Sequence, residues 1–198
     1  MRFQGKTILV TGAAGGIGSN ITTAFKAEGA RVAVTDLDTK GIEAAAAFDG
    51  NLTDRAFCDA LPQMVKDKLG SLDIVINNAG IITRGPLPEA SDNDIALSLA
   101  VNVEAPLRLC RASIPIMAKQ GGGTIVNTCS CWGLRPGPNH PIYVMTKAAL
   151  ASLTQCLGRD HAHQNIRVNA VCPNEVDTAM LRSGFEARGL DPKKAIDD

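Results

Sequence analysis

The sequence predicts an α/β fold, a doubly wound parallel sheet in three α/β/α layers with right-handed crossovers. Two observations carry this prediction. Short apolar runs alternate with helical patterns along the whole chain, and a glycine-rich turn joins the first run to the first helix. The 198 residues suit one domain, residues 1–198, with neither an internal repeat nor a linker.

Composition excludes several classes of partner. The formal net charge is zero and no basic stripe stands out, so we expect no contact with nucleic acid or an anionic membrane surface. No apolar run approaches the roughly eighteen residues of a membrane span. The sequence begins without an export leader, and its six cysteines lack a paired metal-binding spacing. We therefore expect a cytoplasmic protein with reduced thiols and no metal site.

The first strand, residues 6–10, runs into a glycine-rich turn, Thr11–Gly18. Glycines in such a turn let the backbone approach a pyrophosphate closely, and the helix that follows, through Ala27, offers free N–H groups and a positive dipole end. Similar turns occur in α/β folds that bind no nucleotide. The strand–turn–helix context favours phosphate binding.

The second strand, residues 30–34, leads to Asp36. A carboxylate there would accept hydrogen bonds from the adenosine ribose hydroxyls and repel a 2′-phosphate. No lysine or arginine follows directly, so NAD is expected in preference to NADP. Alternatively, Asp36 is a turn residue before a short helix over residues 39–47.

The middle of the chain continues the alternation. We expect a strand over residues 48–52, a helix from residues 53–54 to Leu69, and a strand over residues 72–76 that ends in Asn77–Gly80. A long helix over residues 92–119 carries Asn102 on an apolar face. A buried asparagine needs partners, so Asn102 either ties two elements together or holds a water that relays protons.

Residues 124–129 form the strand that leads to Ser130, and a helix follows from Pro141 to about Asp160. Tyr143 and Lys147 are four residues apart and share one face of this helix. A free tyrosine has a pKa of about 10, and a nearby ammonium would lower it. The hydroxyl of Ser130 would hold a carbonyl or alcohol oxygen while the tyrosine exchanges the proton. A Tyr-x-x-x-Lys pair alone is weak, because many helices carry it by chance.

These motifs occur together in one order. Thr11-Gly12-x-x-x-Gly16-x-Gly18, Asn77-Asn78-Ala79-Gly80, Asn102, Ser130, Tyr143-x-x-x-Lys147 and Pro173…Thr178 follow one another along the chain, before and after a last strand at residues 167–171. In this order and spacing the chain resembles the short-chain dehydrogenase/reductase family. The resemblance covers nearly the whole chain and implies a Rossmann-type fold. It also implies an enzyme that interconverts a secondary alcohol and a ketone with NAD.

The resemblance assigns roles to residues. Tyr143 would be the general acid and base, Ser130 would polarise the substrate oxygen, and Lys147 would lower the tyrosine pKa and hold the nicotinamide ribose. Asn102 would support a proton-relay water. The implied cofactor contacts are Thr11, Gly12, Gly16, Ile17, Gly18, Asp36, Asn51, Leu52, Asn78, Ala79, Gly80, Tyr143, Lys147, Pro173, Val176 and Thr178.

The substrate pocket is less well specified. Trp132, Arg135 and His140 lie where the family lines its pocket, and the two basic side chains hint at a polar or anionic alcohol. A solvated arginine and a turn histidine are the alternatives. The resemblance also implies a homodimer or homotetramer, formed through the helices around residues 95–117 and 148–157.

Several features depart from the family pattern. Asn174 replaces a frequent glycine, Asn51 replaces a frequent aspartate, and the stretch between Asp36 and Asn51 is short. Family members continue for about fifty further residues, with another helix and a seventh strand. We therefore expect a truncated chain, a chain shown without its tail, or a short protein, with the last strand at an edge of the sheet. A non-catalytic NAD-binding or scaffold protein is the alternative function.

Overall fold

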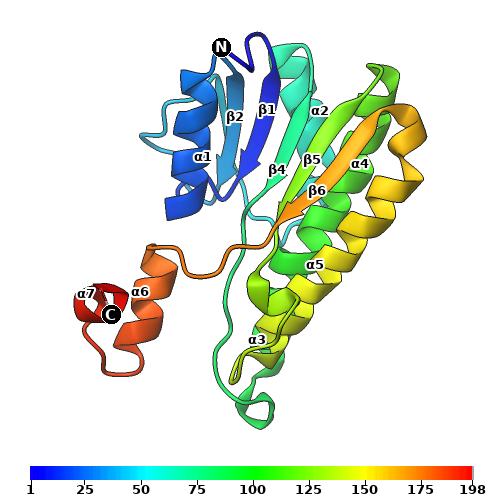
Figure 1. The fold of residues 1–198 in the computed structure, drawn as a ribbon. Coiled ribbons are helices and arrows are strands. Elements are labelled where there is room, and N and C mark those ends of the chain that lie inside the picture. The colour runs from blue at the N-terminus through cyan, green and yellow to red at the C-terminus, as the bar shows by residue number, and fades with distance from the viewer. Residues whose placement is uncertain (198) are drawn as a thin grey trace.

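The computed structural model describes residues 1–197 and contains one six-stranded sheet in the order β3-β2-β1-β4-β5-β6 (Figure 1). The strands are β1 (Thr7–Thr11), β2 (Arg31–Asp36), β3 (Ala46–Asp49), β4 (Ile74–Asn77), β5 (Gly123–Thr128) and β6 (Ile166–Val171). Every neighbouring pair is parallel. The predicted fold class is confirmed, and among the described residues β6 is an edge strand, as expected.

Helices lie on both faces of the sheet and below its carboxyl edge (Figure 1). They are α1 (Gly16–Ala27), α2 (Arg55–Leu69), α3 (Asp92–Leu99), α4 (Ala105–Lys119), α5 (Pro141–Asp160), α6 (Ala179–Glu186) and α7 (Pro192–Asp197), with a π-helical segment, Ala100–Glu104, between α3 and α4. Short 3₁₀ turns cover Leu87–Glu89, Cys131–Gly133 and Ala162–Gln164. In Figure 1, α6 and α7 lie beneath the carboxyl ends of the strands. No helix among the described residues is long and apolar enough to cross a membrane.

Alternation along the strands divides the core into two layers. Leu9 and Val75 pack with α2, α4 and Leu157 of α5 on one face. Ile8 and Ile76 pack with α1 on the other. Successive side chains of each strand therefore enter opposite layers, which fixes the register of the strands. Because every neighbouring pair is parallel, all carboxyl ends lie at one edge of the sheet.

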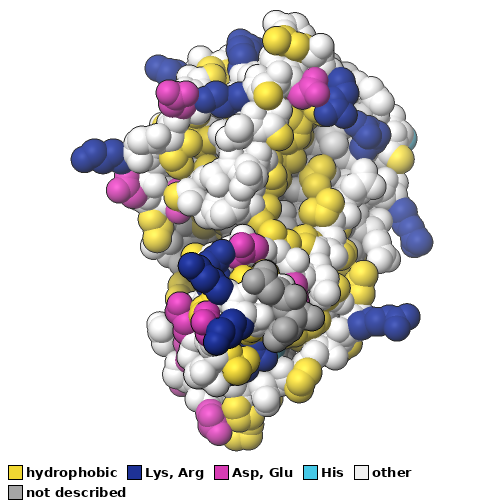
Figure 2. Space-filling view, turned by 60° about the vertical axis from the view of Figure 1, so that its left-hand side comes forward, with side chains coloured by type: hydrophobic (Ala, Val, Ile, Leu, Met, Phe, Trp, Pro, Cys, Tyr) yellow, Lys and Arg dark blue, Asp and Glu magenta, His cyan; other side chains and the backbone are white. Residues whose placement is uncertain are grey.

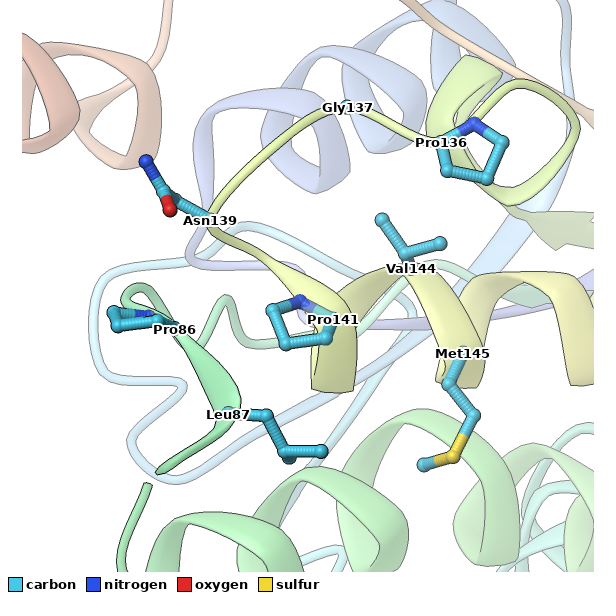
Figure 3. A pocket seen from close by; sticks show the side chains of 8 residues that line it. All are labelled: Pro86, Leu87, Pro136, Gly137, Asn139, Pro141, Val144 and Met145. Atoms are coloured by element: carbon cyan, nitrogen blue, oxygen red, sulfur yellow. The ribbon is translucent and has the colours of Figure 1, made fainter. Parts of the chain in front are cut away.

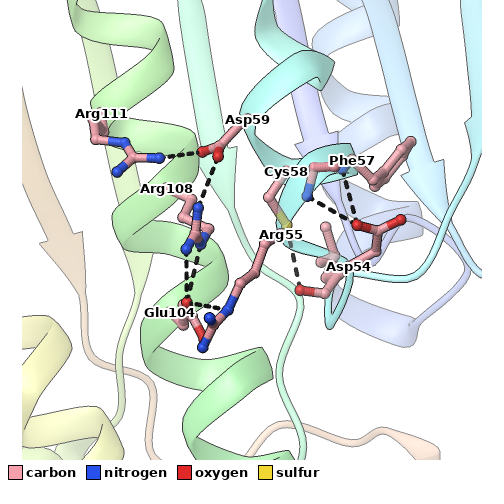
Figure 4. Close-up of polar contacts among 10 residues, drawn as sticks. Asp54, Arg55, Phe57, Cys58, Asp59, Glu104, Arg108 and Arg111 are labelled. Atoms are coloured by element: carbon pink, nitrogen blue, oxygen red, sulfur yellow. Dashed lines mark hydrogen bonds and ion pairs between the residues drawn. The ribbon is translucent and has the colours of Figure 1, made fainter.

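Local signals set the ends of α2 where the sequence predicts them. The Asp54 carboxylate accepts the backbone N–H groups of Ala56 and Phe57, and Gly70 ends the helix in the left-handed region at φ 84°. A cluster of ion pairs joins α2 to α4, with Arg108 between Asp59 and Glu104 (Figure 4).

Two expectations about the elements were wrong. No helix forms over residues 39–47, because Ala46 pairs with Ala33 of β2 and the Ala45 N–H donates to the Val32 carbonyl at 2.8 Å. Sheet pairing thus overrides the helix propensity of the alanines, and β3 begins two residues before the predicted strand. The long helix over residues 92–119 is interrupted, since Asn102 lies in a π-helical segment.

Candidate functional site

The carboxyl ends of the central strands open into a cavity of about 550 Å³. Its walls come from the loop after β4, the end of β5, the start of α5 and the segment that leads into α6. Ser130, Tyr143 and Lys147 lie on this wall together. Figure 2 shows the face that carries α6 and α7, where hydrophobic side chains line a hollow and both basic and acidic side chains lie beside it. An apolar cavity with a few convergent polar groups is typical of a small-molecule site.

The glycine loop between β1 and α1 is tightly packed, and a side chain at Gly12 or Gly18 would collide with the backbone. Gly12 has φ +65°, and a Cβ there would lie 2.8 Å from the Ala79 Cα. A Cβ on Gly18 would lie 2.0 Å from the Gly12 carbonyl oxygen. Helix α1 begins at Gly16 with neither a side-chain cap nor an acidic residue in its first turn. Its first N–H groups are therefore available to an anion.

Asn78 holds this loop in place from β4. Its Nδ2 donates to the carbonyl oxygens of Thr11 and Gly12 at 3.0 and 3.2 Å, and the Thr11 hydroxyl accepts the backbone N–H groups of Asn78 and Ala79 at 3.0 Å each. The Asn78 Oδ1 is buried without a hydrogen-bond partner among the described residues. The predicted residues Thr11, Gly12, Asn78 and Ala79 thus form one cluster.

Asp36 lies at the carboxyl end of β2, beside the glycine loop. Its carboxylate accepts the Ala14 N–H at 2.9 Å and the Leu37 N–H at 2.8 Å, so its orientation is fixed. Asn51 follows β3 after Gly50 and is exposed, while Leu52 packs against the core and its carbonyl accepts the Cys58 thiol. Asp36 and Asn51 therefore lie at the carboxyl ends of neighbouring strands, and Leu52 has a packing role.

Tyr143 is partly buried in the cavity wall, and its environment raises the pKa of the phenol. Burial is the main cause, a hydrogen bond with the Ser130 hydroxyl lowers the pKa, and neighbouring Cys131 and Cys129 raise it. Lys147 is not among the groups that lower this pKa, although its Nζ lies 5.7 Å from the centroid of the ring. In the protein alone, Ser130 is the group that favours the phenolate.

Lys147 is 3% exposed, and its Nζ donates to the Thr128 carbonyl at 2.8 Å. Burial lowers the pKa of this lysine to about 8, with small opposing contributions from Cys129 and Cys172. Glycine at position 80 makes room for it, since a Cβ there would lie 3.1 Å from the Nζ. The ammonium is thus held inside the cavity within reach of a bound molecule.

Asn102 is 1% exposed and ties two elements together, one of its two expected roles. Its Oδ1 accepts the Ile81 N–H at 2.9 Å, and its Nδ2 donates to the Ile81 carbonyl at 2.8 Å and to the Thr146 hydroxyl at 3.1 Å. These bonds join the π-helical segment to α5 and to the loop after β4. Both Nδ2 hydrogens are used by these partners, whereas the Oδ1 accepts one bond and can accept a second.

The segment after β6 returns over the glycine loop. Thr178 caps α6, where its hydroxyl accepts the Leu181 N–H at 3.3 Å, and its methyl group lies 2.9 Å from the position of a Cβ on Gly16. Ile17, Pro173, Val176 and Thr178 all line the cavity. Asn174 also lines it, and its Oδ1 accepts the Cys131 thiol at 3.1 Å.

Two of the three residues expected in the substrate pocket line the cavity. Trp132 and His140 have ring centroids 4.6 Å apart, and Trp132 lies edge-on to Tyr143 at 6.5 Å. Arg135 is exposed and is not among the lining residues, which agrees with the alternative of a solvated arginine.

Two other arginines, Arg84 and Arg188, do line the cavity. Nothing in their local sequence distinguishes them from ordinary surface residues, because they reach the cavity only through the fold.

A second hollow, of about 530 Å³, lies on the other side of the loop before α5 (Figure 3). Val144 and Met145 of α5 face it, together with Pro86 and Leu87 from the loop after β4. It contains none of the three polar side chains of the main cavity. Among the described residues, no group of three or more metal-binding side chains is suitably placed to hold an ion.

The main cavity fits a dinucleotide on three observations. A cradle of glycines has no room for side chains, an uncapped helix start faces it, and a carboxylate lies at the end of the next strand. Ile17 of the glycine-rich turn lines the cavity together with the phenol, the hydroxyl and the ammonium. This arrangement can bind two phosphates and transfer a proton.

The sequence matches the profile of the short chain dehydrogenase family over residues 6–189. It is 40% identical over 197 residues to an uncharacterized oxidoreductase of Thermotoga maritima, covering 94% of this chain and 78% of that protein. It is 37% identical over 186 residues to a sorbitol dehydrogenase of Cereibacter sphaeroides, covering 89% and 73%. The crystal structure of a short chain dehydrogenase from Burkholderia cenocepacia in complex with NADP has a TM-score of 0.84 and 35% identity, covering 91% of this chain and 78% of that one.

Proposed function

The chain belongs to the short-chain dehydrogenase family of oxidoreductases, and on that premise we propose that it interconverts a secondary alcohol and a ketone with NAD(H). The observation that carries the proposal is the meeting of Ser130, Tyr143 and Lys147 on the wall of one cavity that also reaches the glycine cradle. The similarity to a sorbitol dehydrogenase supports an alcohol substrate.

In the proposed reaction Tyr143 takes the hydroxyl proton of the alcohol, or returns it to the ketone oxygen. The Ser130 hydroxyl holds that oxygen and stabilises the phenolate by its hydrogen bond to Tyr143. The ammonium of Lys147 supplies positive charge to the cavity and donates to the sugar hydroxyls of the cofactor. When bound, the nicotinamide supplies hydride transfer.

We propose NAD rather than NADP as the cofactor. Asp36 presents a carboxylate, fixed by two backbone N–H groups, beside the cradle, and the loop residue Ala14 adds no positive charge. A carboxylate at this position repels a 2′-phosphate. The relative from Burkholderia cenocepacia was solved with NADP, so the preference must be measured for this chain.

The direct test is an assay with NAD and a panel of secondary alcohols, read at the absorbance band of the reduced nicotinamide. We expect reduction of NAD coupled to oxidation of at least one polar alcohol. The competing function is a non-catalytic NAD-binding or scaffold protein. It predicts cofactor binding by calorimetry without turnover of any alcohol or ketone, and that result would replace the enzyme proposal.

We also propose that the chain self-associates through α4 and α5. Leu107 on α4 and Met145 on α5 are 42% and 48% exposed, so both helices present an apolar side chain that a partner could cover. Light scattering on the purified protein should give the mass of a dimer or tetramer, and a monomeric mass at micromolar concentration would exclude the interface.

A further inference from the structure

Two arginines from separate segments lie at the rim of the cavity. Arg84 belongs to the loop after β4, and Arg188 follows α6. Both line the same cavity as Ser130 and Tyr143. Any role of these two arginines in the cavity concerns the substrate, so this inference rests on the proposed function.

The two guanidinium groups converge on Gly184 of α6. The Arg84 Nη2 donates to the Met180 carbonyl at 2.7 Å and to the Ser183 hydroxyl at 3.3 Å, and it lies 3.0 Å from the position of a Cβ on Gly184. The Arg188 Nε donates to the Gly184 carbonyl at 3.1 Å, and its guanidinium stacks over the Phe185 ring at 4.9 Å. Both groups are therefore held in place before any ligand binds.

Both arginines keep donors that these bonds do not use. A guanidinium has five N–H donors. Arg84 has its Nε and Nη1 groups left, and Arg188 has Nη1 and Nη2. The free Nη1/Nη2 edge of Arg188 suits bidentate binding of a carboxylate or phosphate, whereas Arg84 offers single donors beside it.

The charges around the cavity are unbalanced. Its charged lining residues are three cations, Arg84, Lys147 and Arg188, and one carboxylate, Glu175. Among the side chains of residues 1–196, no carboxylate lies within ion-pair distance of Arg84 or Arg188. Arg182 on the same helix, in contrast, pairs with Asp177. An anion in the cavity would be attracted by the positive charge of both guanidinium groups.

We propose that Arg84 and Arg188 bind an anionic group of the substrate, so that the enzyme prefers a secondary alcohol or ketone that carries a carboxylate or phosphate. The anion would be held at the α6 side of the cavity while the reacting carbon faces Tyr143. This assignment moves substrate recognition from Arg135, which lies outside the cavity, to two residues that only the fold brings together.

Binding can be tested without turnover. Trp132 is the single tryptophan of the chain and lines the cavity, so its fluorescence reports on ligands there. We would titrate the protein with butanoate, with propyl phosphate and with butanamide, which has the shape of butanoate without its charge. Loss of a charge-assisted hydrogen bond weakens binding about tenfold or more. The anions should therefore bind at least about tenfold more tightly than the amide, and the stronger of the two identifies carboxylate or phosphate.

Variants assign the effect to the two arginines. Arg84→Gln and Arg188→Gln should each weaken anion binding about tenfold and leave amide binding unchanged, and Arg84→Lys should keep part of the affinity. Arg135→Gln is the matched control and should change neither. Arg84 also donates hydrogen bonds to Met180 and Ser183 of α6, so Arg84→Gln could unfold the protein. In that case Arg188→Gln alone still tests the assignment.

Three results would overturn the assignment. They are equal binding of acid and amide, an equal effect of Arg135→Gln, and a loss of NAD affinity in the arginine variants that matches the loss for the anions. The last result would assign the arginines to the cofactor phosphates.

Turnover separates this inference from the proposed function. With NAD, 3-hydroxypentanoate should have a KM at least about tenfold below that of its methyl ester, and Arg188→Gln should remove the difference. Equal KM values with turnover of both would refute the anion site and leave the dehydrogenase intact. Absence of turnover with every alcohol would refute the proposed function, while the fluorescence titration would still decide the arginine site.

Discussion

At the scale of single residues, the main feature of the cavity is the buried side chain of Lys147. Lys147 is 3% exposed and has one hydrogen-bond partner, the Thr128 carbonyl, so burial lowers its pKa to about 8. Burial raises the pKa of Tyr143 at the same time. Burial thus shifts both pKa values toward the neutral form, but with a pKa of about 8 Lys147 is still mostly an ammonium at pH 7.

The buried lysine predicts a pH-dependent stability. The folded pKa of Lys147 lies below the ordinary value of 10.5, so the unfolded chain binds more protons between these two values. Stability should therefore rise with pH from about 8 to 10, by about 2 kcal/mol relative to a Lys147→Met variant. Denaturant unfolding of both proteins at pH 7 and pH 10 measures this. The exposed Lys40, replaced by Met, is the control, and a Lys147→Met difference that stays constant between the two pH values would contradict the burial.

Asp36 predicts the cofactor preference. Asp36→Ala removes the carboxylate beside the cradle, so kcat/KM with NADP should rise about tenfold or more relative to NAD. Asp38→Ala is the matched control, because the exposed Asp38 carboxylate accepts only a neighbouring backbone N–H. Kinetics with both cofactors would show the change, and an unaltered ratio in the Asp36 variant would remove this residue from cofactor selection.

At the scale of elements, α1 and the segment before α6 meet at one contact. The methyl group of Thr178 fills the space where a side chain on Gly16 would lie. This contact positions the last part of the cavity wall against the glycine cradle. The segment before α6 can thus pack over the glycine cradle because Gly16 has no side chain.

The contact can be tested by a pair of variants. Gly16→Ala should destabilise the protein by about 1–2 kcal/mol by overpacking and weaken NAD binding. Thr178→Ser removes the methyl group and keeps the hydroxyl that caps α6. The double variant should recover most of the stability. Thermal unfolding and NAD titration of the four proteins form a cycle, and the absence of rescue would show that Gly16 is required for another reason.

Helices α2 and α4 are joined by Arg108. Its side chain is 17% exposed, and it donates to Asp59 at 2.7 Å and to Glu104 at 3.0 Å (Figure 4). A hydrogen bond from Arg111 lowers the pKa of Asp59, and one from Arg108 lowers that of Glu104. The stability from both carboxylates is present above their ordinary pKa values and is lost as pH falls below about 4.

Arg108→Met should therefore lower the Tm by a few degrees at pH 7, and the loss should shrink below pH 4. Arg111 is 61% exposed and contacts only Asp59, so Arg111→Met should cost less. Calorimetry at several pH values measures both variants. An Arg108→Met loss that is independent of pH would indicate packing rather than charge.

Elements bounded by local chemistry could be predicted from the sequence. Helix α2 begins after Asp54 and ends at Gly70, as its cap residues indicate. The conformation of the segment around the start of β3 could not be predicted, because Ala46 pairs with Ala33 of β2, which is distant in the sequence. The π-helical segment was also missed, since it arises where Asn102 bonds to the loop after β4.

At the scale of the whole molecule, the cavity is assembled from four distant segments at the carboxyl edge of the sheet (Figure 1). The motif residues could be predicted because their spacing is tied to a strand end or a helix turn. Arg84 and Arg188 could not, since they are 104 positions apart in the sequence and meet only at Gly184. Arg135 lies close to Tyr143 along the chain, yet it is not among the residues that line the cavity.

The most direct test of the account is the effect of Tyr143→Phe on turnover and on cofactor binding, measured in one preparation. General acid and base catalysis contributes about 10²–10⁴-fold. The variant should lose at least about a hundredfold in kcat with NAD and an alcohol that the wild-type protein oxidises, with the Kd for NAD unchanged within about threefold. Retention of wild-type turnover by Tyr143→Phe would contradict the central assignment of this phenol as the proton donor and acceptor.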